Sequence, residues 1–161
     1  DIPAWGISTA DYHEEGLGGE KLGNFPTVFL VKKKTRDEVL LALKQGRMYA
    51  CRSGNNFQRF VLQDFSVSDS NTNSQANMGD TLELNSKPEI RINVSSSDQK
   101  VHNVDVRIIR SGKLIRTISK TTPFAVDFKD DYFNPGELIY YRLEIPGKLV
   151  SNPIFVKFGR E

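Results

Sequence analysis

Hydrophobic and polar residues alternate along most of the second half of the chain. Ile90, Ile92 and Val94 are separated by polar residues, and the same two-residue period recurs over 104–108, 124–128 and 139–145. Successive side chains of a β-strand point to opposite faces, so each of these stretches has one apolar and one polar face. The pattern predicts antiparallel sheets with one face packed on a core and the other in water.

Further strands are expected over 60–67 and 154–158, where short apolar stretches occur between turn-forming residues. The dipeptide Ser111-Gly112 lies between two apolar stretches and indicates a hairpin turn. Roughly seven or eight short strands with turns at regular intervals are typical of an immunoglobulin-like antiparallel β-sandwich.

The first third of the chain has a different pattern, which predicts a helix over 35–46. Thr35 is a candidate N-cap, Glu38 occupies the third helical position of a capping box, and Gly46 is placed to end the helix in the left-handed conformation. Three apolar residues of this helix are expected to form a stripe against a neighbour. They are Val39, Leu40 and Leu43.

Short apolar stretches at 27–31 and 48–51 flank this helix, and strand, helix and strand in succession are typical of an α/β unit. The predicted fold class is therefore α+β and predominantly β, with an immunoglobulin-like antiparallel β-sandwich preceded by a short strand–helix–strand segment. The change of pattern predicts a domain boundary between 1–54 and 55–161, with the second part able to fold alone.

Composition excludes several classes of protein. The 161 residues are 38% hydrophobic and 26% charged, which is typical of a folded domain, and the net charge of +2 gives no indication of a nucleic-acid partner. A single cysteine excludes an intrachain disulfide, and no apolar run reaches the roughly 20 residues of a membrane span. Because the chain starts at Asp1, we expect a piece of a longer protein, and no compartment or oligomeric state is assigned.

Candidate metal ligands occur near the start of the chain, in Asp11-Tyr12-His13. Residues two apart on an extended chain point the same way, so Asp11 and His13 could reach one metal ion. Imidazole nitrogen and carboxylate oxygen are standard ligands of zinc, manganese and iron. The alternative is a solvated loop with a capping aspartate.

The order of several short motifs resembles the last part of a PHP-domain metallohydrolase, of the polymerase and histidinol phosphatase family, in the branch whose barrel is followed by a C-terminal β-sandwich. The resemblance covers nearly the whole chain. It rests on Trp5–His13, a glycine-rich loop, the helix end at Leu43–Ala50, and the strand motifs at Val106–Lys113, Tyr140–Glu144 and Ser151–Val156.

The resemblance implies a role for the pair found above. Residues 1–54 would be the C-terminal remnant of a β/α barrel, 55–161 an accessory sandwich, and Asp11 and His13 ligands in a cluster of divalent metal ions (zinc, manganese or iron). A metal of this kind activates water for hydrolysis of phosphoester-type bonds. The family's other ligands are absent from this sequence, so the resemblance implies a missing N-terminal barrel as partner, no cofactor in this chain by itself, and an inactive fragment.

A second function class remains open, in which the chain is a non-catalytic immunoglobulin-like binding or adhesion module and Asp11-x-His13 is incidental. In that case Tyr140, Tyr141 and Arg142 could contribute to a carbohydrate or peptide surface, although Tyr141 in the core beside exposed neighbours is the simpler interpretation.

Two further patterns have structural interpretations. The run Asp69–Asp80 has oxygen-bearing residues at calcium-loop spacing, but lacks the central glycine and the final glutamate, so a polar loop between strands is expected. Cys51 ends an apolar stretch and is expected to be a small core residue.

Overall fold

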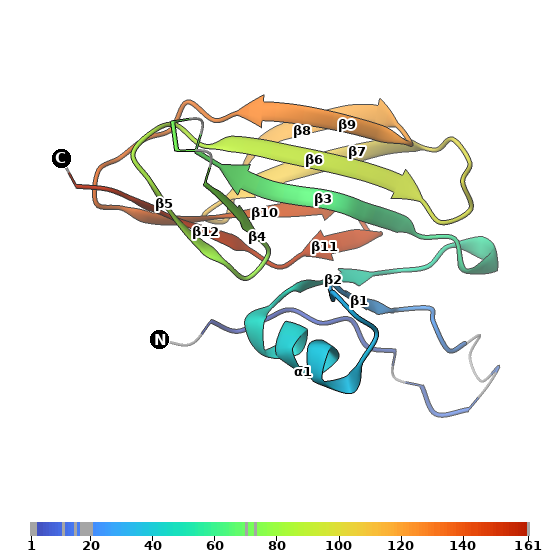
Figure 1. Ribbon diagram of the computed structural model, residues 1–161. Coiled ribbons are helices and arrows are strands. Elements are labelled where there is room, and N and C mark those ends of the chain that lie inside the picture. The colour runs from blue at the N-terminus through green and yellow to red at the C-terminus, as the bar shows by residue number, and fades with distance from the viewer. Residues whose placement is uncertain are drawn as a thin grey trace.

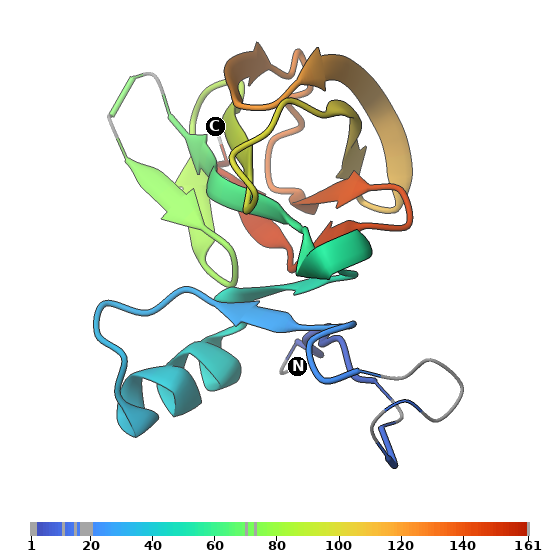
Figure 2. The same ribbon diagram turned by 90° about the vertical axis from the view of Figure 1, so that its right-hand side faces the viewer.

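The structure is a computed structural model that describes residues 3–10, 12–14, 16, 21–69, 71–72 and 74–160. It is predominantly β, with two sheets packed as a sandwich and one α-helix, as the alternation of the sequence predicts (Figure 1). Seen end-on, the sheets enclose the core, and the helix lies outside them beside the first strand (Figure 2).

The smaller sheet has the order β4-β3-β6-β9 and is antiparallel throughout. Its central strand β6 has the alternation described above, and Ile90, Ile92 and Val94 are fully buried. A bulge in β3 between Leu62 and Asp64 shifts the register against β6. The strands are β3 (Phe60–Ser68), β4 (Gln75–Asn77), β6 (Glu89–Ser96) and β9 (Phe124–Lys129).

The larger sheet divides at its central strand β10. One side of β10 pairs with β7, which pairs with β8, while the other side pairs with β12 over its first half and with β11 over its second. β12 continues to β5, in parallel, and β11 continues to β2 and β1. The strands are β1 (Thr27–Phe29), β2 (Met48–Cys51), β5 (Thr81–Leu84), β7 (Asn103–Arg110), β8 (Lys113–Thr121), β10 (Leu138–Ile145), β11 (Leu149–Ser151) and β12 (Ile154–Phe158).

The hairpin predicted at Ser111-Gly112 joins β7 to β8. The φ angles are 46° at Ser111 and 82° at Gly112, and Arg110 pairs with Lys113 across the turn. Positive φ at both central residues is the geometry whose twist matches that of the flanking strands.

The helix α1 (Arg36–Gln45) has the predicted bounds, because both caps form. The Thr35 hydroxyl accepts a hydrogen bond from the Glu38 amide, and Gly46 adopts φ 73° and donates to the last carbonyls. Glu38 reaches the Lys32 amide rather than closing the box on Thr35. The predicted apolar stripe is mostly exposed, and Ala42 is the buried residue of this helix. A short 3-10 turn, Asn55–Phe57, follows β2.

The strands on either side of α1 are antiparallel, whereas the strands of an α/β crossover unit are parallel. The reason lies in where the chain returns after the helix. Met48 pairs with Phe29, and the Leu30 amide donates to the Arg47 carbonyl, so β2 starts beside the end of β1.

Residues 1–54 are joined to the sandwich by strand pairing and by shared core. β2 pairs with β11, and Tyr49 and Cys51 belong to the same buried apolar cluster as the sandwich strands. The Tyr49 hydroxyl accepts a hydrogen bond from the Leu62 amide at 3.3 Å, close to the bulge of β3. The predicted boundary between 54 and 55 therefore crosses a continuous set of contacts.

A buried polar cluster links the two sheets. Asp130 follows β9 and accepts two hydrogen bonds from Arg110 Nη1, at 2.9 and 2.7 Å, and one from the Tyr141 hydroxyl at 2.6 Å. The Arg110 guanidinium also lies over the ring of Tyr132, 3.9 Å from its centroid. Burial raises the pKa of the Tyr141 hydroxyl, which therefore remains a donor at neutral pH.

Asp130→Ala is expected to lower the free energy of unfolding by about 2–3 kcal/mol, because it leaves Arg110 and Tyr141 without their acceptor in a largely dry site. Asp127→Ala is the matched control, since its ion pair with Arg91 is exposed and should contribute at most about 1 kcal/mol. Urea unfolding of the two variants measures the difference. Equal losses of unfolding free energy would show that the buried cluster stabilises the fold no more than an exposed ion pair does.

Candidate functional site

The segment that precedes Asp11 and His13 is held in place by side chains instead of strand pairing. The Asn152 side chain accepts a hydrogen bond from the Gly6 amide at 2.8 Å and donates to the Gly6 carbonyl at 3.3 Å. Thr27 Oγ1 does the same for Ser8, accepting from its amide and donating to its carbonyl, both at 2.9 Å. Each side chain thus replaces the partner residue that a neighbouring strand would supply.

Trp5 fixes the start of this segment against the helix. Its indole N–H donates to the Lys44 carbonyl at 3.1 Å, and its ring lies against Gly46, where a Cβ atom would come within 2.4 Å of the ring. The ring centroid of Phe155 in β12 is 6.2 Å away. We call residues 5–8 the anchored segment.

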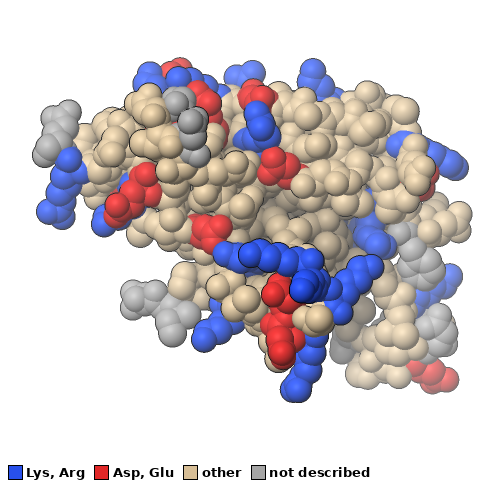
Figure 3. All heavy atoms as spheres, viewed as in Figure 1, with Lys and Arg blue, Asp and Glu red and all other residues tan. Residues whose placement is uncertain are grey.

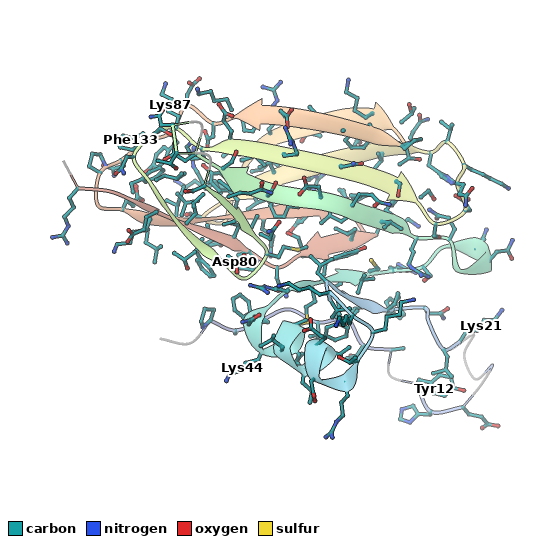
Figure 4. All side chains as sticks on the ribbon, in the orientation of Figure 1. Tyr12, Lys21, Lys44, Asp80, Lys87 and Phe133 are labelled. Atoms are coloured by element: carbon teal, nitrogen blue, oxygen red, sulfur yellow. The ribbon has the colours of Figure 1, made fainter. Side chains whose placement is uncertain are left out.

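Beyond the anchored segment the chain reaches the predicted metal ligands. His13 is exposed, as is Glu14, while Asp11 lies outside the described residues. Tyr12, labelled in Figure 4, lies away from the sandwich, at the other end of the molecule from the start of the described chain. Within the described part of the chain, no group of three or more His, Cys, Asp or Glu side chains is placed to hold a metal ion.

Comparison with protein-family models and with curated proteins finds no match to this sequence.

The loop with calcium-like spacing is held by protein donors at both ends. Asp69 is buried, and its Oδ1 accepts from the Asn71 amide at 2.8 Å and the Ser86 hydroxyl at 2.5 Å. Asp80 pairs with Arg47 at 3.2 Å and lies between the sandwich and α1 (Figure 4). Gln75–Asn77 forms the short strand β4, which pairs with β3, so the predicted loop is interrupted by a strand.

Two further side chains with possible reactivity, Cys51 and His102, are buried or engaged. Burial raises the pKa of the Cys51 thiol to about 11, so this thiol stays protonated and is a poor nucleophile at neutral pH. His102 Nε2 lies 2.9 Å from an Asp98 oxygen, and its side chain is 31% exposed. The Ser96 hydroxyl and then the neighbouring Lys100 amide and His102 hold the pKa of Asp98 at about 2.

Tyr141 is fully buried and Tyr140 and Arg142 are partly exposed, as the strand alternation indicates. Tyr140 and Arg142 line a groove of about 820 Å³ on the outer face of the larger sheet. No pattern in the sequence predicted this groove. The available signal was the apolar and aromatic character of Leu138 and Tyr140 on the face of β10 that should be polar.

On the face of the molecule seen in Figure 3, basic and acidic side chains are interspersed, and neither sign of charge covers a large area by itself. None of the helices that the structure describes is long and apolar enough to cross a membrane.

Proposed function

We propose that this chain is the C-terminal portion of a PHP-type metal-dependent hydrolase, acting on phosphoester or related bonds. Asp11 and His13 would supply two ligands to its metal ions, and the sandwich would be an accessory module. The remaining ligands would come from a preceding barrel of the parent protein. A divalent metal ion held there would supply an activated water and polarise the scissile bond.

The observation that carries this proposal is the anchored segment. A metal ligand acts best when the backbone that carries it is fixed, because small displacements of a ligand weaken binding and catalysis. Asn152 and Thr27 fix Gly6 and Ser8 by paired hydrogen bonds, only a few residues before Asp11 and His13. His13 is exposed, and the barrel of the parent protein would bring the other metal ligands to it.

His13→Ala and Asp11→Ala in the parent protein are each expected to reduce metal-dependent phosphodiester hydrolysis by about 100-fold or more, because each removes a ligand of the activated water. The matched control is His102→Ala, which removes the other histidine from a site within the sandwich. Turnover should be measured with manganese and with zinc, and metal content should be measured on the same samples.

Wild-type turnover and metal content in both ligand variants would show that the metal assignment is wrong. The isolated chain is expected to be inactive, because it supplies two metal ligands and a catalytic site normally has about three. Turnover by the isolated chain, with contaminants excluded, would contradict this expectation.

A further inference from the structure

The groove on the larger sheet lies where that sheet divides. β11 and β12 separate at Asn152 and Pro153, and the start of the described chain runs alongside as a wall. In Figure 1 this start lies beneath the sandwich on the side of β12. A volume of about 820 Å³ is within the range of sites that bind small molecules.

The floor of the groove is apolar and aromatic. Tyr140 and Phe155 are directly opposite each other across β10 and β12, with ring centroids 6.3 Å apart. Leu138 next to them is 60% exposed, and Val150 on β11 is 40% exposed. Apolar side chains this accessible on the outer face of a sheet favour contact with an apolar ligand.

Two polar side chains of the groove floor, Asn152 and Ser151, are already used by the protein. Both side-chain atoms of Asn152 bind Gly6, and the Ser151 hydroxyl accepts from the Leu143 amide at 2.8 Å. A sugar or a peptide would bring many hydrogen-bonding groups onto this surface, whereas the neutral side chains left to pair with them are mainly the hydroxyls of Thr81 and Tyr140, so most of those groups would lose water without gaining a partner. The floor therefore favours a ligand with an apolar body.

The charged residues that line the groove are Arg142 and Lys157, and no carboxylate is among the described lining residues. Arg142 is held by Glu144, Nη2 to Oε1 2.5 Å, and is partly buried. Lys157 makes an exposed pair with Glu83 at 3.1 Å, with 57% and 74% of the two side chains exposed. Because such a pair contributes little stability, Lys157 can exchange Glu83 for an anion in the groove.

We propose that this groove binds a small amphipathic anion, with its ring or alkyl body on Tyr140 and Phe155 and its carboxylate or phosphate at Lys157. Arg142 adds positive potential at the other end. This proposal does not depend on the proposed hydrolase.

Binding can be followed by NMR titration of isotope-labelled protein, because Trp5 is the single tryptophan and its ring contacts Phe155 at the groove. The probes share one ring system and differ in charge: naphthoate, naphthyl phosphate, naphthalenemethanol and naphthylmethylamine. Both anions should shift the Trp5 indole signal and bind at least about fivefold more tightly than the alcohol, with the amine weakest. Comparing the two anions distinguishes a carboxylate ligand from a phosphate ligand.

Two variants test the role of Lys157, because each removes the same ion pair. Lys157→Gln should weaken naphthoate binding by about three- to tenfold, whereas Glu83→Gln should leave it unchanged or tighten it. Tyr140→Ala should weaken the binding of all four probes. The unfolding midpoint of each variant verifies that the variant is folded. Lys157→Arg keeps the positive charge and should retain naphthoate binding, which tests the role of charge even if Tyr140→Ala is too unstable to use.

Equal affinities for the anion, alcohol and amine would overturn the proposal, as would equal effects of Lys157→Gln and Glu83→Gln. Binding of an acidic oligosaccharide or an acidic peptide at the groove, without binding of naphthoate or naphthyl phosphate, would also overturn it and would assign the surface to that class of ligand.

Discussion

Gly79→Ala is expected to lower the free energy of unfolding by about 3 kcal/mol or more. Gly79 adopts φ 87°, and a Cβ atom there would lie 1.8 Å from the carbonyl oxygen of Gln45. That oxygen belongs to the backbone of the last residue of α1, so it cannot move aside as a side chain would. The loop must shift and lose its hydrogen bond from the Gly79 amide to the Pro153 carbonyl, 2.8 Å long.

Gly147→Ala is the control for this variant. Gly147 has a similar positive φ of 66°, but no atom lies within 4 Å of the place that a Cβ atom would occupy, so it should show only the roughly 1–2 kcal/mol cost of an alanine in the left-handed region. Chemical denaturation of both variants separates the free-energy cost of the steric clash from the cost of placing alanine at a positive φ. Similar losses of unfolding free energy in the two variants would mean that the loop at Gly79 can move away from α1 at little cost.

Residues 55–161 expressed without 1–54 are expected to fold, but with a free energy of unfolding lower by about 4 kcal/mol or more than that of the whole chain. The deletion removes Met48, Tyr49 and Cys51, which are 0%, 1% and 3% exposed, and uncovers β11. Loss of a single large buried side chain usually costs about 3–5 kcal/mol, partly offset here because the deleted chain no longer has to be ordered.

Denaturant unfolding of both proteins tests this, with Tyr49→Phe as a milder variant. That change removes only the acceptor of the Leu62 amide and should cost about 1 kcal/mol. A fragment with the midpoint of the whole chain would support an independent sandwich with its boundary at 54/55. A fragment without a cooperative transition would show that the boundary is wrong.

The strands with regular alternation were predictable from sequence, because a period of two that continues over several residues matches a half-buried strand and does not match a helix. The buried faces of β6, β7 and β10 are those that the pattern indicates. β4, β5 and β11 are three or four residues long and too short to show a period. The direction of β2 against β1 depends on where the chain returns after α1, which residue patterns do not encode.

The predicted helix stripe shows another limit of sequence patterns. Its residues are spaced for burial, but Leu40 and Leu43 are 49% and 41% exposed. Amphipathic spacing indicates which face could be buried and not whether a neighbour covers it. The groove was not predictable for a similar reason. Its lining comes from residues as distant in sequence as Pro3 and Lys157, and only the folded sheet brings them together.

The pairing of Asn152 with Gly6 has a consequence for chemical ageing. Asparagine deamidates mainly when the backbone nitrogen of the next residue attacks the side-chain amide, and here the next residue is Pro153, whose nitrogen carries no hydrogen. Conversion to aspartate would replace the N–H that donates to the Gly6 carbonyl by an oxygen that repels it. The residue order Asn-Pro therefore protects against deamidation a side chain that holds Gly6 through both its backbone groups.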